Sequence, residues 1–153
     1  VFVPDGSPCE MIDQIEQLGA EPLLVGEAGR VLQDVMTTGP MMNSAVEQGL
    51  VLISDGVATL VTGCAHPGID VMVEEAAAVA AAPVEMVVGG FHLLKETKKN
   101  ALKTAERLRA LGVERVAPSH CTGEKAVEAL LKVFDDGFVE SGIGKVIEIG
   151  ERR

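Results

Sequence analysis

The sequence predicts an α/β protein built on a partly parallel sheet, and three observations support that prediction. From residue 63 onward, apolar runs of strand length alternate with segments whose apolar residues recur at helical spacing. Each of the chain's three histidines follows one of those apolar runs within a few residues. The 153 residues are 47% hydrophobic, which is enough to bury the core of one domain.

The first 60 residues are less regular and predict short elements. The run over 49–62 predicts two strands joined at Asp55-Gly56, because Asp-Gly between alternating apolar residues is a strong hairpin signal. The remaining elements expected here are a strand over 1–3, a helix over 8–18, and short strands over 23–25 and 35–38.

The second part of the chain predicts three helices between strands. Pro83 ends the first helix and Gly112 ends the second, while Thr97 is a suitable N-cap for the second and Thr122 for the third. The predicted helices cover 68–82, 97–111 and 123–134, and the predicted strands cover 84–88, 113–117 and 145–149.

Composition excludes several classes of partner. A net charge of −10 argues against a nucleic acid, because phosphate backbones bind basic surfaces. No apolar run approaches the ~18 residues of a membrane-spanning helix. Three cysteines without framework spacing favour a reducing compartment, so we expect a cytoplasmic protein. The partner we expect is a small-molecule substrate, which can be phosphorylated.

The three histidines are the candidate functional residues. His66, His92 and His120 each stand in a loop after a predicted strand, and the carboxyl ends of parallel strands meet at one edge of a sheet. Imidazole is the commonest metal-ligand side chain, so we expect a divalent metal there, Zn²⁺ first, with Fe or Mn as alternatives. Cys64, Cys121 or an acid can complete the ligand set.

Other interpretations of these loops stay open. Any one histidine could instead bond a carbonyl in its turn or precede a helix. Cys64 and Cys121 could form a thiol site, although no Cys-x-x-Cys is present. Ser119 lacks the Gly-x-Ser-x-Gly turn of a serine hydrolase.

Three motifs in this order resemble those of metallo-β-lactamase-fold hydrolases, in particular the branch of dihydropterin ribofuranosylaminobenzene-phosphate synthases. The resemblance implies the C-terminal half of a four-layer αβ/βα sandwich. It implies that His66 and His120 are metal ligands. His92 lies near the place of a bridging Asp and would be a third ligand or a catalytic residue that contacts substrate. The motifs are Thr62-Gly-Cys-Ala-His66-Pro-Gly-Ile69, Val88-Gly-Gly-Phe-His92-Leu93 and Pro118-Ser-His120-Cys-Thr-Gly-Glu-Lys-Ala126.

The resemblance also implies an activity. We expect a metal-dependent hydrolase of phosphoester-type substrates, with the synthase (a transferase) or a non-catalytic α/β binding module as alternatives. The His-x-His-x-Asp-His signature of that fold is absent from the 153 residues. We therefore expect residues 1–153 to be a single, incomplete domain that is weak or inactive alone, and a homo-oligomer if its open sheet face pairs with a second copy.

Overall fold

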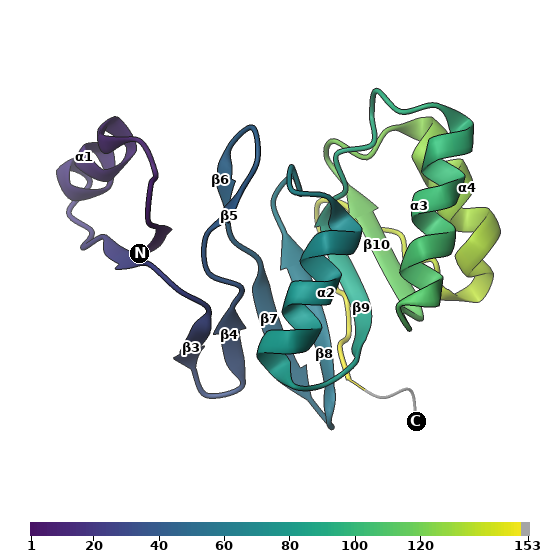
Figure 1. The fold of residues 1–153 in the computed structure, drawn as a ribbon, viewed down its shortest axis with the longest axis horizontal. Coiled ribbons are helices and arrows are strands. Elements are labelled where there is room, and N and C mark those ends of the chain that lie inside the picture. Colours follow the sequence, from purple (N-terminus) through teal and green to yellow (C-terminus); the bar gives the residue numbers. More distant parts are fainter. Residues whose placement is uncertain (151–153) are drawn as a thin grey trace.

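The computed structural model describes residues 1–150, and its centre is a mixed sheet of six strands (Figure 1). The strand order is β10-β9-β8-β7-β4-β3, in which β8, β9 and β10 run parallel and the other neighbours run antiparallel. The α/β class is therefore confirmed. The strands are β3 (Gly29–Leu32), β4 (Val35–Thr37), β7 (Leu50–Ser54), β8 (Val57–Thr62), β9 (Val84–Gly90) and β10 (Arg115–Ser119).

The predicted hairpin at Asp55-Gly56 is confirmed. Asp55 and Gly56 both have positive φ, 53° and 82°, as a two-residue type I′ turn requires. The turn fixes the register of β7 on β8, so that Leu50 at the start of β7 stands opposite Val61 near the end of β8. Residues just before β7 therefore lie at the edge where the parallel strands end.

Helix α2 (Ile69–Ala80) covers one face of the sheet (Figure 1). Its buried residues, Ile69, Met72, Val73 and Ala76, recur at helical spacing and pack in the same core cluster as Leu60 and Val87 of the sheet. Because β8 and β9 are apolar along most of their length, this face forms the main core.

Helices α3 (Lys98–Ala110) and α4 (Glu124–Phe134) pack against each other beside β10 (Figure 1). Thr97 caps α3 as predicted, with its Oγ1 accepting from the N–H of Asn100 at 3.2 Å. The strand predicted over 113–117 begins two residues later, because the N–H of Val113 closes the end of α3 on the carbonyl of Leu108.

The predicted cap of α4 is wrong. Gly123 is the N-cap residue, and no side chain caps the helix. The Thr122 hydroxyl instead donates to the carbonyl of Ser119 at 2.7 Å and accepts from the N–H of Phe91 at 3.2 Å. Thr122 therefore ties the loop after β10 to the loop after β9.

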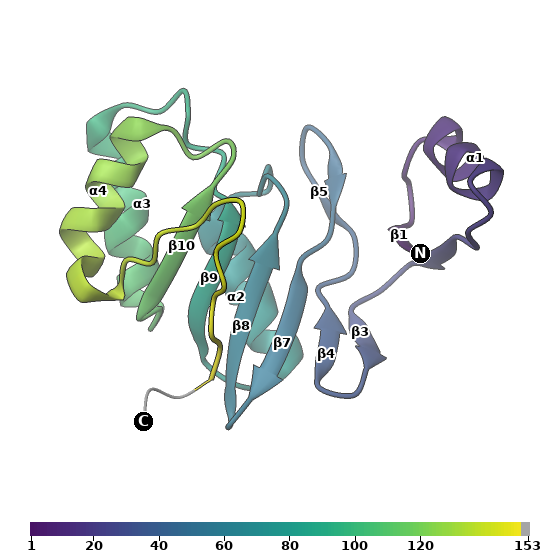
Figure 2. The same ribbon diagram turned by 180° about the vertical axis from the view of Figure 1, so that it is seen from behind.

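The strand predicted over 145–149 is also wrong. A short helical turn, η1 (Asp135–Gly137), leads to Phe138, which bridges Val116 of β10, and the chain then leaves the sheet edge. It crosses the face opposite α2 (Figure 2). Ser141 Oγ donates to the carbonyl of Pro118 on this path. The apolar alternation of 145–149 is that of a strand, but a segment lying across a sheet face has no neighbouring strand to pair with.

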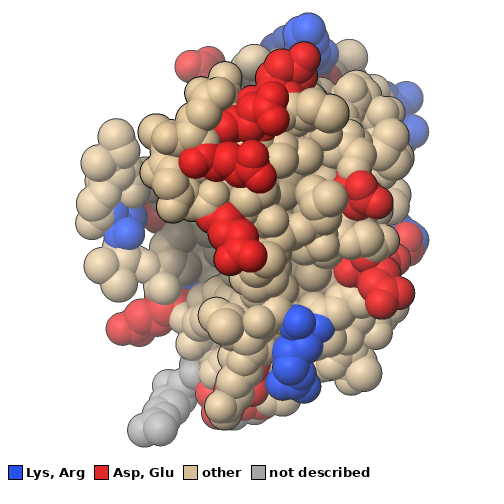
Figure 3. Space-filling view, turned by 90° about the vertical axis from the view of Figure 1, so that its left-hand side faces the viewer, with Lys and Arg blue, Asp and Glu red and all other residues tan. Residues whose placement is uncertain are grey.

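The N-terminal residues form a separate small unit at one end of the molecule (Figures 1 and 2). β1 (Phe2–Pro4) pairs in parallel with β2 (Leu23–Val25), and α1 (Cys9–Gln17), which connects them, has no buried residue. Acidic side chains gather on this end of the molecule (Figure 3). No helix within residues 1–150 is long and apolar enough to cross a membrane.

Candidate metal centre

The three histidine loops meet at one edge of the sheet. His66, His92 and His120 follow β8, β9 and β10, which are adjacent and parallel, so their carboxyl ends share that edge. The imidazole rings of His66 and His92 are in contact, with centroids 4.3 Å apart and planes tilted by 56°.

His66 is held by the small hairpin of β5 (Met41–Met42) and β6 (Val46–Glu47). The backbone N–H of His66 donates to Oε2 of Glu47 at 2.6 Å, and Asn43 donates to the His66 carbonyl at 2.7 Å. Glu47 reaches this loop because β6 leads into β7, whose first residue stands opposite the end of β8. Register within the sheet thus places a carboxylate beside the first histidine.

The Nδ1 atom of His66 is buried and, among the described residues, has no hydrogen-bond partner. It lies 2.9 Å from Oε1 of Glu47, which is an ion-pair distance, but the ring is not oriented for a hydrogen bond. Buried polar atoms are normally satisfied, so a buried imidazole nitrogen without a hydrogen bond, beside a carboxylate, fits a place where a cation can bind. Cys64 completes this group, and the ligand atoms of Glu47, Cys64 and His66 all lie within 4.8 Å of one another.

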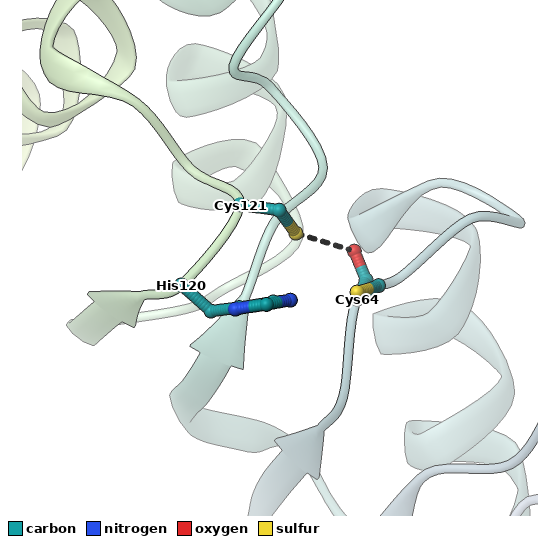
Figure 4. Close-up of side chains that lie close together, drawn as sticks. All are labelled: Cys64, His120 and Cys121. Atoms are coloured by element: carbon teal, nitrogen blue, oxygen red, sulfur yellow. Dashed lines mark hydrogen bonds between the residues drawn. The ribbon is translucent and has the colours of Figure 1, made fainter.

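A second group of possible ligands lies next to the first. The ligand atoms of Cys64, His120 and Cys121 also lie within 4.8 Å of one another, and Figure 4 shows the three side chains converging from two loops. The Cys121 thiol donates to the carbonyl of Cys64 at 3.4 Å. Burial raises the pKa of the Cys64 thiol, and the hydrogen bond and charge of the neighbouring Cys121 raise it further.

The end of β9 lets these loops approach each other. A Cβ on Gly90 would stand 2.5 Å from the carbonyl of Gly63 and 2.8 Å from Sγ of Cys121. His92 and His120 themselves have positive φ, 53° and 49°, which non-glycine residues adopt sparingly. Strained backbone of this kind clusters at functional sites, where the surrounding fold enforces it.

The three predicted histidines differ in which group of possible ligands they belong to. His66 belongs to one ligand group and His120 to the other, while His92 is exposed and belongs to neither, touching the site through the ring of His66. Glu47 was not predicted as a site residue. Glu47 lies just before β7, which pairs antiparallel with β8, the strand that precedes His66. Only that strand pairing brings Glu47 to the site, and the pairing cannot be read from the sequence.

A pocket of about 480 Å³ adjoins His120. It is lined by Ser119 at the end of β10, by residues of the following loop such as Thr122, and by the first two turns of α4. A larger pocket of about 560 Å³ lies near the other end of β10, around Arg115 and Asp135, and its lining contains neither histidine nor cysteine. Of these two pockets, the one beside His120 adjoins a candidate metal ligand.

Comparison with solved structures identifies the architecture. A metal-dependent hydrolase of the β-lactamase superfamily aligns with a TM-score of 0.78 and 28% sequence identity over 91% of this chain and 63% of its own. The fold is that of the metallo-β-lactamase superfamily. The sequence motifs therefore predicted the superfamily correctly.

Sequence comparison adds two relatives from Methanocaldococcus jannaschii. One is 7,8-dihydropterin-6-methyl-4-(β-D-ribofuranosyl)-aminobenzene-5′-phosphate synthase, 33% identical over 80% of this metallo-β-lactamase-fold chain and 39% of its own length. The other is an uncharacterised protein, 31% identical over 72% of this chain and 41% of its own length. The chain thus spans about two fifths of the length of these relatives, and no family model matches it.

These comparisons correct the activity expected from the sequence. A hydrolase was expected, whereas the relative whose name states an activity is a synthase, so the hydrolase prediction is wrong. The likeness to a hydrolase structure supports the shared fold, and a fold hosts different reactions on the same framework.

Proposed function

We propose that this chain supplies metal-binding and substrate-facing residues to a synthase of the dihydropterin type. The name of the relative describes a product in which a 7,8-dihydropterin is joined through its 6-methyl group to a ribofuranosyl aminobenzene 5′-phosphate. The observation that carries the proposal is the buried, unsatisfied Nδ1 of His66 beside Glu47, at the strand edge where that relative aligns. A transferase of this kind replaces the hydrolase as the expected activity.

Within this proposal His66 and His120 are metal ligands, and Glu47 positions the His66 loop by accepting from the backbone N–H of His66. A carboxylate that holds the segment carrying a ligating imidazole helps to fix where its ring stands. The bound divalent ion, Zn²⁺ or alternatively Fe or Mn, supplies Lewis acidity that polarises a substrate group.

His92 is the residue proposed to face the substrate. It is exposed, its positive φ fixes the loop direction, and its ring lies against that of His66. An imidazole in this position can act as a general acid or base toward a substrate without belonging to the ligand groups. The pocket beside His120 gives a small phosphorylated substrate room next to one of the proposed metal ligands.

The proposal also includes metal ligands from the His-x-His-x-Asp-His signature, outside these 153 residues. The His-x-His-x-Asp-His signature is absent from these 153 residues, and the two-fifths coverage of the relatives leaves room for it elsewhere in a longer product. Sequencing the reading frame upstream of Val1 tests this point directly. The homo-oligomer and the cytoplasmic location stay predictions.

The activity is tested by a coupling assay on this chain and on the product of its full reading frame. Each is incubated with Zn²⁺, Fe²⁺ or Mn²⁺, a 7,8-dihydropterin bearing a leaving group on its 6-methyl carbon, and the ribofuranosyl aminobenzene phosphate. Mass spectrometry should detect the coupled product with the full product. His66→Ala and His120→Ala should abolish it, while Lys99→Ala, an exposed position on α3, should not.

Two results would contradict the proposal. One is the absence of coupled product with every metal. The other is full metal content, by elemental analysis, in the double variant His66→Ala/His120→Ala, which would remove both histidines from the ligand set.

A further inference from the structure

Two of the chain's three cysteines stand together with His120 at the strand edge. Cys64 follows β8, whereas His120 and Cys121 follow β10, so the group joins loops more than 50 residues apart in the sequence. Their two sulfur atoms and one imidazole nitrogen lie within 4.8 Å of one another, and all three side chains point into the same space (Figure 4).

The surrounding backbone keeps this arrangement in place. The N–H of Gly90 donates to the carbonyl of Gly63 at 2.9 Å, and the N–H of Leu94 donates to the carbonyl of Cys121 at 3.0 Å. The absent side chain of Gly90 leaves the space that Sγ of Cys121 fills. These backbone hydrogen bonds and the close approach at Gly90 bring the two thiols together over the end of β9.

The donor set is that of a soft metal site. Two thiolates and one imidazole match the ligands that proteins use for Zn²⁺ in tetrahedral sites, with the fourth position left for water or substrate. Both cysteines are half-buried and free, and His120 is exposed on the open side. Cys9, the remaining cysteine, lies on α1 at the far end of the molecule (Figure 1).

We propose that Cys64, His120 and Cys121 form a thiolate-rich site for a thiophilic divalent cation such as Zn²⁺. The site deepens the proposed metal centre, since His120 belongs to both, but it does not depend on the synthase activity. Cys64 also belongs to the group with Glu47 and His66. Its sulfur is therefore shared between that group and the group with His120 and Cys121. The thiolates would give this edge a preference for soft cations that three histidines alone would lack.

Cobalt reports on thiolate ligands directly, so the test uses Co²⁺ as the probe. The reduced chain is titrated with Co²⁺ under anaerobic conditions, and the near-ultraviolet thiolate-to-cobalt charge-transfer band is measured. Zn²⁺ is then added and should remove the band. Cys121→Ser should lower the band by roughly half, because one of two thiolate ligands is lost, and Cys64→Ser/Cys121→Ser should abolish it.

Controls separate this site from its neighbours. Cys9→Ser should leave the band unchanged, and His66→Ala should retain it, because neither residue belongs to the group. Absence of the band in the wild-type chain, its persistence in the double cysteine variant or its loss in Cys9→Ser would overturn the proposal. Circular dichroism of each variant confirms that the fold is intact. A full reading-frame product that shows the band but gives no coupled product with any metal would contradict only the proposed function.

Discussion

The Gly90→Ala variant tests whether close approach at the end of β9 builds the site. The added methyl group would stand 2.5 Å from the carbonyl oxygen of Gly63 and 2.8 Å from Sγ of Cys121, distances that real side chains do not tolerate. Gly90 has no positive φ, so the substitution introduces a steric clash without backbone strain. One of the two loops must therefore move away from the other.

Two opposing effects set the change in unfolding free energy of Gly90→Ala. Inserting a methyl group into a packed site costs about 1–3 kcal/mol. Replacing glycine by alanine also restricts the unfolded chain, which stabilises the fold by about 0.4–1 kcal/mol. Gly63→Ala is the matched control, because its added Cβ meets nothing within 4 Å and it lies in the same site. The stabilisation that comes from restricting the unfolded chain is common to both variants. Their difference in unfolding free energy therefore reports the cost of the clash, about 1–3 kcal/mol.

Thermal unfolding measures this difference. The melting temperature of Gly90→Ala should lie roughly 2–12 °C below that of Gly63→Ala, given about 2–4 °C per kcal/mol for a chain of this size. Binding of Zn²⁺ or Co²⁺ should also weaken in Gly90→Ala, because Cys121 is displaced from Cys64. Equal melting temperatures and equal metal affinities in the two variants would refute the argument that Gly90 brings the loops together.

Three further predictions concern the core, a helix end and the carboxylate at the site. Leu60→Ala should lower the unfolding free energy by about 2–5 kcal/mol in denaturant titrations, because Leu60 is fully buried, while Leu94→Ala, 63% exposed, should change it by less than about 0.5 kcal/mol. Thr97→Ala should cost about 0.5–2 kcal/mol and speed amide exchange at Asn100, which loses its capping partner; unchanged exchange there would count against the cap. Glu47→Gln should lower Zn²⁺ affinity about 10–100-fold in a chelator competition, with the exposed Glu10→Gln as control, and an unchanged affinity would remove Glu47 from the site.

Features encoded by neighbouring residues could be predicted from the sequence. The Asp55-Gly56 turn was predictable because both residues tolerate the positive φ that a two-residue hairpin needs. The N-cap at Thr97 was predictable because a cap depends on residues within one turn. The meeting of the histidine loops was also predictable, since adjacent parallel strands end at one edge whatever their exact register.

Features that depend on distant partners could not be predicted. The run over 145–149 has the alternation of a strand, yet it crosses a sheet face and pairs with no strand. The Thr122 hydroxyl has a carbonyl and an N–H within reach from two other segments, so it does not cap α4. Glu47 joins the site through the pairing of Leu50 with Val61, which no local pattern reveals. Each of these outcomes was decided by tertiary contacts.

Sheet register therefore links the fold to the chemistry of this site. All the candidate ligands lie in loops or at the end of the short β6, but the pairing of Leu50 with Val61, Thr62 with Gly89, and Gly90 with Ser119 sets where those segments meet. A slip of one residue in any of these pairs would turn side chains to the opposite face and separate the ligand groups. Two glycines end β9 at the middle of this arrangement: Gly89 lies against Thr62 at the end of β8, and Gly90 lies against the loops after β8 and β10. Substitutions there should thus weaken metal binding although neither glycine is itself a ligand.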